Sequence, residues 1–596
     1  MQHLEPISGF KLEQYFWWTK MLNFYDFEVF KEDWLVVIIN LYEKSETVIV
    51  NDKKKLEEYY EAHKNEIWVG YNNNHYDQYI FKAILCDFDP KEVNDFIIVQ
   101  DKPGWQFSSM FRKITMYNYD TMFRSDRGLK ALEGFMGNDI KETSVSFDID
   151  RKLTEAEIAE TIKYCCHDVE QTIEVFFARK DKFDAQMGLI KMFNLPLSDI
   201  SRTLTQLSAK VLEAQRPKES RHDEFDISFP ATLRIEKYKE VVEWYKDESN
   251  RSYDKSLTID VAGVETQFGW GGIHSAVPKY VGEGYFINMD VTSLYPSLMI
   301  RYNLHSRNIK DPQKYVDMYH TRVKFKAEKN PLQIALKEPL NGSYGAMKDK
   351  NNPLYDPLMA NNICVHGQLL LLDLMEKLEP YAEIIQSNTD GILIKMPNSM
   401  RGKCKESAKD IWFETIDDIV YEWEQRTGLK MEFDEYCKVF QKDVNNYLAV
   451  SPDGKYKSKG SYVKKQNSLD YDLPIVNKAM IEYMVNDISV ENTINNCDQL
   501  IMFQKVVKLT GKFKHAIHND KILNEKCFRV FASKRESDSY MGKQKTDGAT
   551  VEKFANTPDH CFINNDDVKT AKTPSKLDRQ WYIELAKERL RQFGVM

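Results

Sequence analysis

The sequence predicts a multidomain α/β protein, on the basis of its length and of two repeated local patterns. The chain has 596 residues, several times the size of a typical domain, so about three to five folding units are expected. Short apolar runs separated by polar turns predict β-hairpins at residues 22–39 and 384–394. Longer stretches with helical periodicity, such as residues 155–168 and 358–378, predict helices between these hairpins.

The composition is typical of a soluble globular protein. Hydrophobic residues make up 42% of the chain and charged residues 29%, and no run of about 18 apolar residues predicts a membrane span. The first residues lack the pattern of a signal peptide, so a cytoplasmic location is expected. The nine cysteines form no C-x-x-C pair, which argues against a zinc cluster. The net charge of −9 argues weakly against a nucleic-acid partner, although carboxylates gathered for metals would also lower it.

The segment 286–296 combines a strand end with a turn that suits an anion. Strand-forming residues lead to Asp290, and the chain then turns at once through Ser293, Leu294 and Tyr295. Successive backbone N–H groups in such a turn can face a phosphate. One carboxylate and one aromatic ring are therefore expected beside a phosphate cradle. Taken alone, the pattern also fits a core strand followed by a capped turn.

The first predicted hairpin carries two acids on one face. Because side chains alternate along a strand, Asp26 and Glu28 point the same way, among the apolar neighbours Phe24, Phe27 and Val29. Two such acids would repel each other unless a cation lay between them, and a solvated strand face is the alternative.

Two later segments add acids that the fold can bring to this pair. Residues 67–70 predict a strand, followed by a polar turn and the start of a helix at Asp77, which alone could be a helix cap. A helix with a capping box opens near residue 154 and places Tyr164 and Asp168 four residues apart on one face.

Together these segments resemble the three motifs of the 3′–5′ proofreading exonuclease domain, which has a ribonuclease-H-like fold. The motifs are Asp26-x-Glu28, Asn73-x-x-x-Asp77 and Tyr164-x-x-x-Asp168. The resemblance implies that the four acids hold two Mg²⁺ ions about 3.5–4 Å apart. It also implies that Tyr164 orients the attacking water or the scissile phosphate, and that Asn73 contacts DNA. Lys141 is a further candidate for that phosphate, with a plain surface lysine as the alternative.

Three further segments resemble the catalytic motifs of the B-family DNA polymerases, in the family order. The first is Asp290-x-x-Ser293-Leu294-Tyr295-Pro296, the second Lys337-x-x-x-Asn341-Gly342-Ser343-Tyr344-Gly345, and the third Asn388-Thr389-Asp390 at the tip of the second hairpin. Three departures stand out. Gly342 replaces a usual Ser, Pro339 lies inside the predicted helix, and Asn388 replaces an Asp. We expect Asn388 to be tolerated, because the second acid is the principal ligand in the family.

The resemblance implies a right-hand polymerase with palm, fingers and thumb. Asp290, Val291 and Asp390 are expected to hold two Mg²⁺ ions, for which Mn²⁺ can substitute. Tyr295 is expected under the sugar, where it excludes a 2′-hydroxyl. The residues expected at the deoxynucleoside triphosphate are Ser293, Leu294, Tyr295, Arg322, Lys326, Lys337, Asn341 and Tyr344.

Contacts to DNA are expected from two places. Gly271 and Gly272 lie in a glycine-rich segment that resembles the family's template-contacting linker, with a tight hairpin as the alternative. Lysines interleaved with tyrosines after residue 440 suit a surface that follows a duplex backbone. Tyr447 is expected near the primer terminus, with Lys442 or Lys459 in the role of the family's lysine.

The resemblance divides the chain into an exonuclease domain (1–190), a helical connecting segment (191–265), a palm (266–310 and 347–460), fingers (311–346), and a thumb with a C-terminal element (461–596). The implied function is template-directed DNA synthesis from a primer 3′-end with 3′–5′ proofreading. We expect a monomer of the compact phage or mobile-element type. Its expected partners are primer-template DNA, deoxynucleoside triphosphates and replication accessory proteins, with no membrane.

Two alternatives stay open from the sequence. The first is a 3′–5′ exonuclease whose polymerase half serves as a DNA-binding module, which Asn388 suggests. The second is a non-catalytic replication scaffold. Primer extension with deoxynucleotides and Mg²⁺ separates the first from a polymerase, and metal-dependent degradation of single-stranded DNA would exclude the second.

Overall fold

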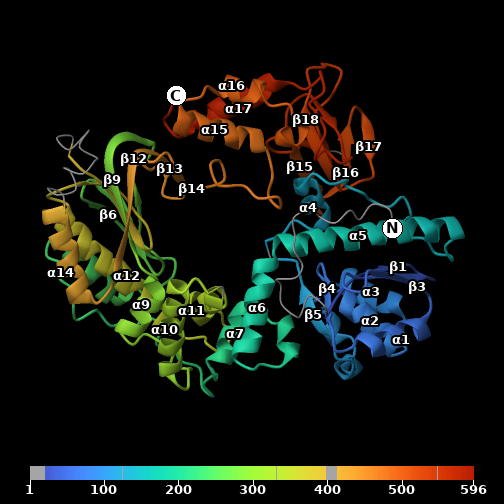
Figure 1. Cartoon of the computed structure of the whole chain (residues 1–596), viewed down its shortest axis with the longest axis horizontal. Helices are drawn as coiled ribbons and strands as arrows, with labels where there is room; N and C mark the ends of the chain where they lie inside the picture. Colours follow the sequence, from blue (N-terminus) through green and yellow to red (C-terminus); the bar gives the residue numbers. More distant parts are fainter. Residues whose placement is uncertain (1–20, 124, 331, 398–412, 547, 549) are drawn as a thin grey trace.

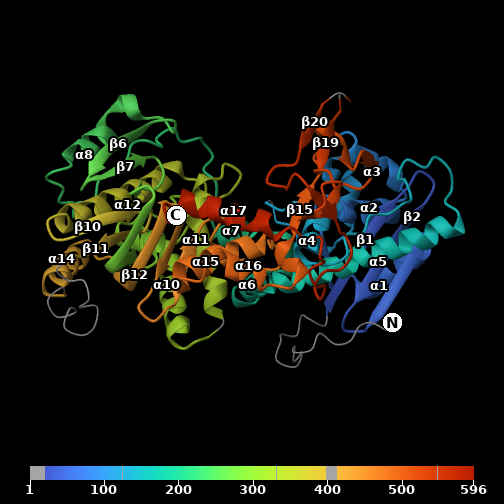
Figure 2. The same cartoon turned by 90° about the horizontal axis from the view of Figure 1, so that it is seen from above.

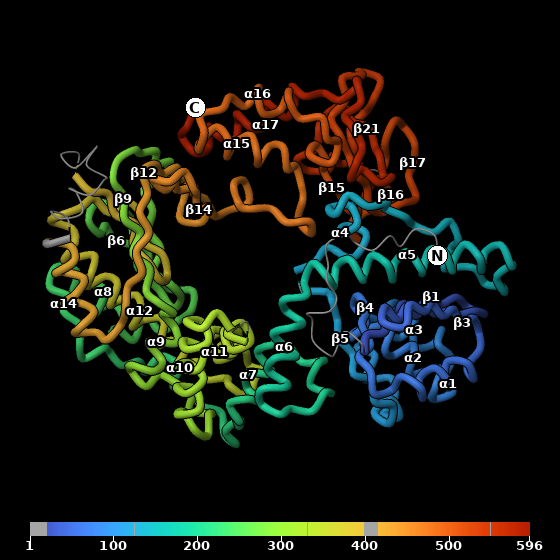
Figure 3. Tube along the Cα trace, in the orientation of Figure 1, coloured from blue at the N-terminus to red at the C-terminus, as the bar shows by residue number. Residues whose placement is uncertain are grey.

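The structure is a computed structural model that describes residues 21–123, 125–330, 332–397, 413–546, 548 and 550–596. Figures 1 and 3 show the elements following one another around an open circle. An N-terminal unit (blue) lies opposite a large central sheet (green to orange), and the C-terminal elements (red) return to the N-terminal unit. The first and last thirds of the chain therefore lie side by side.

The N-terminal unit is a sheet between two layers of helices. Its strand order is β3-β2-β1-β4-β5, with β1 antiparallel to β2 and parallel to β4. The strands are β1 (Leu22–Val29), β2 (Trp34–Asn40), β3 (Ser45–Val50), β4 (Ile67–Gly70) and β5 (Tyr117–Asp120). On one face, apolar residues pack against α1 (Lys53–His63), α2 (Asp77–Leu85) and α3 (Pro90–Ile98). On the other, Phe24 and its neighbours pack against α5 (Glu155–Ala178). The first predicted hairpin and the capping box at Thr154 are confirmed.

Three helices link this unit to the centre of the chain. They are α6 (Lys180–Met192), α7 (Leu204–Val211) and α8 (Lys239–Lys246). Leu189 of α6 and Leu207 of α7 pack against Ala335, so two of the links contact the helix expected to carry the second polymerase motif. Residues 256–261 form a strand that pairs with β7 (Val264–Gly269), so the central sheet begins before residue 266.

The central sheet has nine strands in the order β14-β13-β12-β9-β11-β10-β8-β7-β6. They are β6 (Ser256–Val261), β7 (Val264–Gly269), β8 (His274–Ala276), β9 (Tyr280–Val291), β10 (Glu383–Ser387), β11 (Gly391–Lys395), β12 (Met431–Asp443), β13 (Asn446–Val450) and β14 (Tyr456–Lys459). Figure 2 shows β6 and β7 at one edge, next to α8. Because β9 lies between β11 and β12, the predicted second hairpin lies beside the strand that carries Asp290.

Helices cover the central sheet with a large apolar core. They include α9 (Leu294–Arg301), α12 (Pro357–Leu378) and α14 (Asp418–Thr427). Within the described residues, α12 is the one helix long and apolar enough to cross a membrane, and 94% of its apolar window is buried inside the protein. A helix that is buried to this extent is part of the protein core.

A pair of helices extends from the central core. They are α10 (Pro312–Ala327) and α11 (Leu332–Lys348), and the Tyr315 hydroxyl donates to the Leu340 carbonyl oxygen at 2.7 Å. The helical assignment of α11 continues through Pro339, although proline lacks the N–H that a helix interior uses.

The C-terminal part contains a helical core and two small sheets. The helices are α15 (Pro474–Asn486), α16 (Val490–Asn495) and α17 (Arg579–Gln592). One sheet has the order β15-β18-β21, with β15 (Lys505–Lys508), β18 (Cys527–Ala532) and β21 (Cys561–Ile563). The other has the order β17-β16-β19-β20, with β16 (Phe513–His518), β17 (Lys521–Leu523), β19 (Gly542–Lys545) and β20 (Val551–Lys553). Strands β15 and β18 pack against α4 (Leu129–Met136) of the N-terminal unit, which closes the circle.

Two candidate active sites

The four acids of the N-terminal unit converge between the sheet and helix α5. Asp26 and Glu28 lie on the β1 face that α5 covers, as the period of two predicts. Asp77 opens α2, is only 2% exposed, and accepts the backbone N–H of Phe27 at 3.1 Å. Asp168 comes from α5 and is 8% exposed. Three elements far apart in sequence thus gather the first cluster.

Burial raises the pKa of each of these carboxyls. For Asp26 the next largest cause is the carboxylate of Asp77, and for Glu28 it is that of Asp168. Burial raises the pKa of Asp77 to about 7, and that of Asp168 to about 6 despite a neighbouring lysine. Oxygen atoms of Asp26 and Glu28 lie within 4.8 Å of each other and of the Cys165 sulfur. Such crowded acids favour a bound cation.

The lysine beside Asp168 is Lys130, which the sequence analysis did not identify. Its ammonium group on α4 contacts the Asp168 carboxylate, lies 3.1 Å from Glu133 Oε1, and sits 4.5 Å from the centre of the Tyr164 ring. Lys141 instead pairs with Asp139 at 3.1 Å and is 56% exposed in its side chain, as the surface alternative predicted. No local motif distinguishes Lys130 from other helix lysines.

Asn73 does not face solvent in this structure. Its side chain is fully buried and donates to Asn118 Oδ1 at 3.0 Å and to the Tyr119 carbonyl oxygen at 3.2 Å. The expected DNA contact would require these hydrogen bonds to break. The side chain holds the loop before Asp77 against β5, which is a positioning role.

The second cluster lies at the ends of β9 and β11. Asp290 pairs with Gly391 in the strand register, and the Val291 N–H donates to the Asp390 carbonyl oxygen at 2.7 Å. The two carboxylates therefore come from adjacent strand ends, as predicted. Partial burial, followed by the charge of Asp290, raises the pKa of Asp390. Ser293 has a φ of 50° and starts the turn into α9.

A lysine from β14 reaches this cluster. Lys457 Nζ lies 3.1 Å from Asp290 Oδ2 and 3.3 Å from Asp434 Oδ2. Partial burial lowers the pKa of Lys457, but the Asp290 carboxylate outweighs it and the pKa is raised. The candidate Lys459 pairs with Tyr447 in the register of β13 and β14, whereas the Lys442 ammonium lies 5.3 Å from the centre of the Tyr462 ring. The lysine nearest Asp290 is thus neither of the two expected.

Tyr295 and Tyr344 form a stacked pair next to the second cluster. Their ring centroids are 4.0 Å apart with an interplanar angle of 20°, and the Tyr344 hydroxyl lies 2.6 Å from the Cys364 sulfur. Lys337 and Asn341 precede Tyr344 by seven and three residues on α11, and both are exposed. Because residues three, four and seven positions apart lie on the same face of a helix, these three side chains form a line from the exposed Lys337 to the stacked tyrosine pair.

Three cationic side chains on α10 and α11 have donor atoms without a partner among the described residues. In the described part of the chain, Lys326 and Lys337 have no ion-pair or hydrogen-bond partner for their side chains, and the buried Nε atom of Arg322 also lacks one. They come from the neighbouring helices α10 and α11. Unpaired cations on packed helices are suited to bind an anion.

Asn388 has a structural task in the turn. Its Oδ1 accepts the N–H of Asp390 at 3.1 Å and that of Gly391 at 3.0 Å, while its own N–H donates to the Gly391 carbonyl oxygen. An Asp would offer the same acceptor atom. The departure from the family motif is therefore compatible with the hairpin that presents Asp390.

The glycine pair lies against the same hairpin tip. A Cβ atom on Gly272 would lie 2.4 Å from Thr389 Oγ1, whereas one on Gly271 would meet open space. The Gly271 carbonyl oxygen accepts a hydrogen bond from Gln368 at 2.8 Å. Glycine at 272 lets the turn after β7 approach the second cluster closely.

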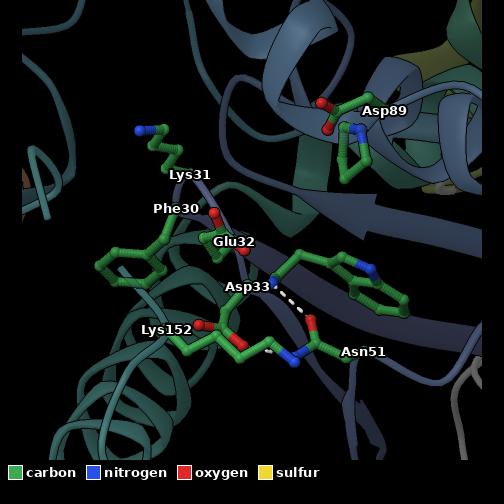
Figure 4. Close-up of a pocket in the computed structure, with 9 residues that line it drawn as sticks. Phe30, Lys31, Glu32, Asp33, Asn51, Asp89 and Lys152 are labelled. Carbon is green, nitrogen blue, oxygen red and sulfur yellow. Dashed lines mark hydrogen bonds between the residues drawn. The ribbon is translucent and has the colours of Figure 1, made fainter. Parts of the chain in front are cut away.

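A polar pocket of about 310 Å³ lies elsewhere, at the turn between β1 and β2 (Figure 4). Its lining includes Asp33, which accepts hydrogen bonds from Asn51 and from the Leu153 N–H. None of the candidate carboxylates lines it. We assign no function to this pocket.

Comparisons with known proteins find distant relatives among archaeal DNA polymerases. No protein-family model matches the chain. A protein named DNA polymerase 1 from Sulfurisphaera ohwakuensis is 25% identical over 206 residues, which are 34% of this chain and 21% of that protein. DNA polymerase 1 from Saccharolobus solfataricus is 23% identical over 299 residues, 42% of this chain and 32% of that protein. These matches span a fifth to a third of the relatives, and they establish distant homology to archaeal DNA polymerases.

A solved structure gives a looser similarity. The family B DNA polymerase from the hyperthermophilic archaeon Pyrobaculum calidifontis superposes with a TM-score of 0.41 and 14% identity, covering 96% of this chain and 78% of that chain.

The first cluster should make metal-free stability depend on pH. Asp77 has a pKa of about 7 in the folded state against 3.8 for the ordinary carboxyl, so the folded chain keeps a proton that the unfolded chain loses. The free energy of unfolding in EDTA should therefore fall as pH rises from about 4 to 7, on the order of a few kcal/mol. Excess Mg²⁺ should reverse the loss. Thermal unfolding of the chain and of Asp77→Asn across this range is the measurement, and equal pH dependence of the two proteins would contradict the assignment.

The turn at Asn388 should depend on its acceptor oxygen. Asn388→Ala removes two hydrogen bonds and should lower the free energy of unfolding by about 1–2 kcal/mol. Asn388→Asp keeps the acceptor and, in Mg²⁺, should lose less. Chemical denaturation of the three proteins tests this, and equal losses for Ala and Asp would show that the oxygen is not used.

Proposed function

We propose that the chain is a DNA-directed DNA polymerase with 3′–5′ exonuclease activity, of the compact type found in phages and mobile elements. The observation that carries the proposal is the presence of two separate carboxylate clusters on two different sheets, each beside the aromatic and cationic groups its reaction would use. All the matched motifs lie between Asp26 and Tyr447, and this short spacing is the support for the compact type.

We assign the domains on the same basis. The exonuclease domain would comprise residues 1–190, the fingers 311–346, and the thumb with its C-terminal element 461–596. The palm would comprise 266–310 and 347–460, to which strand β6 adds residues from the connecting segment 191–265.

The donors of both clusters fit magnesium, since they are carboxylate oxygens and Mg²⁺ prefers oxygen ligands. In the first cluster Asp26, Glu28, Asp77 and Asp168 would hold the ions, and in the second Asp290, Asp390 and the backbone of Val291. Bound there, Mg²⁺ would activate the attacking oxygen and neutralise charge on the phosphate.

The other residues of the second cluster would bind the substrates. Lys337, Arg322 and Lys326 supply cations for a triphosphate, and the backbone N–H groups of Ser293 and Leu294 supply donors. Asn341 and Tyr344 would contact the new base pair, and Tyr295, backed by Tyr344, would lie under the sugar. The DNA would run past Gly271, Gly272, Tyr447 and Lys459.

In the first cluster, Tyr164 and Lys130 flank Asp168 and would orient the water and the scissile phosphate. The alternative of an exonuclease with an inactive polymerase half rested on Asn388. Its support weakens because the Asn388 oxygen makes the turn bonds that an Asp would make. Incubation of the purified chain with a primer-template, deoxynucleotides and Mg²⁺ tests the proposal directly, with primer elongation as the expected result.

The two activities should separate by mutation, because the clusters lie on different sheets. Asp390→Asn should lower the rate of primer extension about a thousandfold or more. It should leave the rate of degradation of single-stranded DNA near its original value. Asp26→Ala combined with Glu28→Ala should do the reverse. Both activities are measured on the same labelled oligonucleotide. Loss of both in a folded single-site variant would refute the two-site proposal.

Tyr295 should control the choice of sugar. Replacing its ring with the smaller Val opens space next to C2′, so ribonucleotide incorporation should rise about 10- to 100-fold relative to deoxyribonucleotide. Single-nucleotide extension with each substrate gives the ratio. Tyr302→Val, on the same helix region but bonded to Thr232, is the control and should leave the ratio unchanged.

A further inference from the structure

Helix α4 contacts both the N-terminal unit and the C-terminal part of the chain. On one side Lys130 and Glu133 face α5, where Lys130 contacts Asp168. On the other side α4 packs against β15 and β18, and its apolar residues share a core with Val506 and Cys527. A Cβ atom on Gly134 would lie 2.8 Å from the Val506 side chain, so the approach is close.

The helix cannot fix its own position. It has eight residues, which is too short to be stable alone in water. Gly128 before it and Gly137 after it both have positive φ, at 92° and 83°, a conformation that glycine adopts readily, so the chain turns at both ends of the helix. Contacts with its surroundings must therefore place Lys130.

Many of these contacts come from the last third of the chain, through polar bonds as well as apolar packing. The Lys508 ammonium donates to the Arg127 carbonyl oxygen at 2.7 Å, and Gln504 donates to that of Phe135 at 3.0 Å. Glu142 accepts the backbone N–H groups of Lys526 and Cys527 at 2.7 and 3.0 Å. Backbone bonds also join Ile140 to Asn565 and Val568 to Gly137.

Arg529 is the centre of this junction. Its side chain is fully buried, and one guanidinium nitrogen donates to the carbonyl oxygens of Gly134 and Asn138 at 3.2 and 2.6 Å. The other donates to the carbonyl oxygens of Asn564 and Asp566 at 3.4 and 2.6 Å. A single planar group therefore ties the C-terminal end of α4 to the loop after β21.

We infer that the C-terminal residues that contact α4 and its flanking loops, at positions 504–508, 526–529 and 564–568, support the exonuclease site, with Arg529 as a positioning residue that fixes α4 and, through it, Lys130 against Asp168. The inference rests on the proposed exonuclease function and deepens it. Without the guanidinium group, four backbone carbonyl oxygens each lose a hydrogen bond, and the end of α4 loses its tie to the C-terminal part. Lys130 then moves relative to Asp168, while the second cluster, on another sheet, is untouched.

The test compares Arg529→Met with Arg579→Met. Arg579 is a matched control because it also donates to carbonyl oxygens, those of Ile494 and Cys497, but none of its hydrogen bonds among the described residues goes to α4 or its flanking loops. Under single-turnover conditions with Mg²⁺, Arg529→Met should lower the maximal rate of single-stranded DNA degradation about 10- to 100-fold. The DNA concentration for half-maximal rate and the rate of primer extension should change less than about twofold. Arg579→Met should leave the ratio of the two activities unchanged.

A double-mutant cycle separates positioning from general destabilisation. Lys130→Met should itself slow degradation, and adding Arg529→Met should slow it no further. Hydrogen exchange of the amides of residues 131–136 should accelerate in Arg529→Met. If Arg529→Met does not fold, Glu142→Gln, which weakens the junction from the other side, takes its place in the cycle.

Additive losses, or degradation at the original rate in a variant whose α4 amides exchange faster, would overturn the inference. A chain that degrades no DNA before mutation would overturn the proposed function, and the inference with it. A chain that degrades DNA equally well with and without Arg529 would overturn the inference alone.

Discussion

The burial of several carboxylates close together is the constraint on which the N-terminal unit depends. Asp77 and Glu28 are nearly excluded from water, and each feels the charge of another acid. Strand β1 and helices α2 and α5 hold these groups together. Burying the carboxylates costs free energy, and apolar packing on both faces of the sheet offsets that cost. The metal-free protein relieves part of the repulsion through Lys130 and through raised pKa values. Such a cluster would favour the Mg²⁺ ions that we propose for it.

In the second cluster, the carboxylates are less buried and their repulsion is reduced in another way. Asp290 retains about a third of its side-chain exposure, and Lys457 bridges it to Asp434. Water and one lysine therefore weaken the repulsion here, whereas Lys130 and raised pKa values weaken it in the first cluster. An open cluster suits a site that must admit a duplex end and a nucleotide. The more enclosed cluster suits a single strand, so the difference in burial follows the difference in the substrates we propose.

Local sequence patterns predicted most elements and the residues that lie on them. Alternation placed Asp26 and Glu28 on one face, and the capping box at Thr154 marked the start of α5. The same patterns could not identify Lys130, Lys457 or Arg529, because each meets its partner across 38 to 395 residues of sequence. The residues next to them in the sequence do not differ from those next to a surface lysine or arginine. The inward orientation of Asn73 was equally hidden, since its partners lie on β5.

The closed path of the chain links the two clusters twice. One connection runs from α5 through α6 and α7 to α11, and the other from the central sheet through α15 and β15 to α4. A single connection would act as a hinge, whereas two connections on opposite sides of a circle restrict rotation about either one. If the proposed activities hold, the clusters keep a nearly fixed separation, and a DNA 3′-end must travel between them. Strand β18, which carries Arg529, and its neighbour β15 are then part of the second of these two connections, which helps to fix the separation of the clusters.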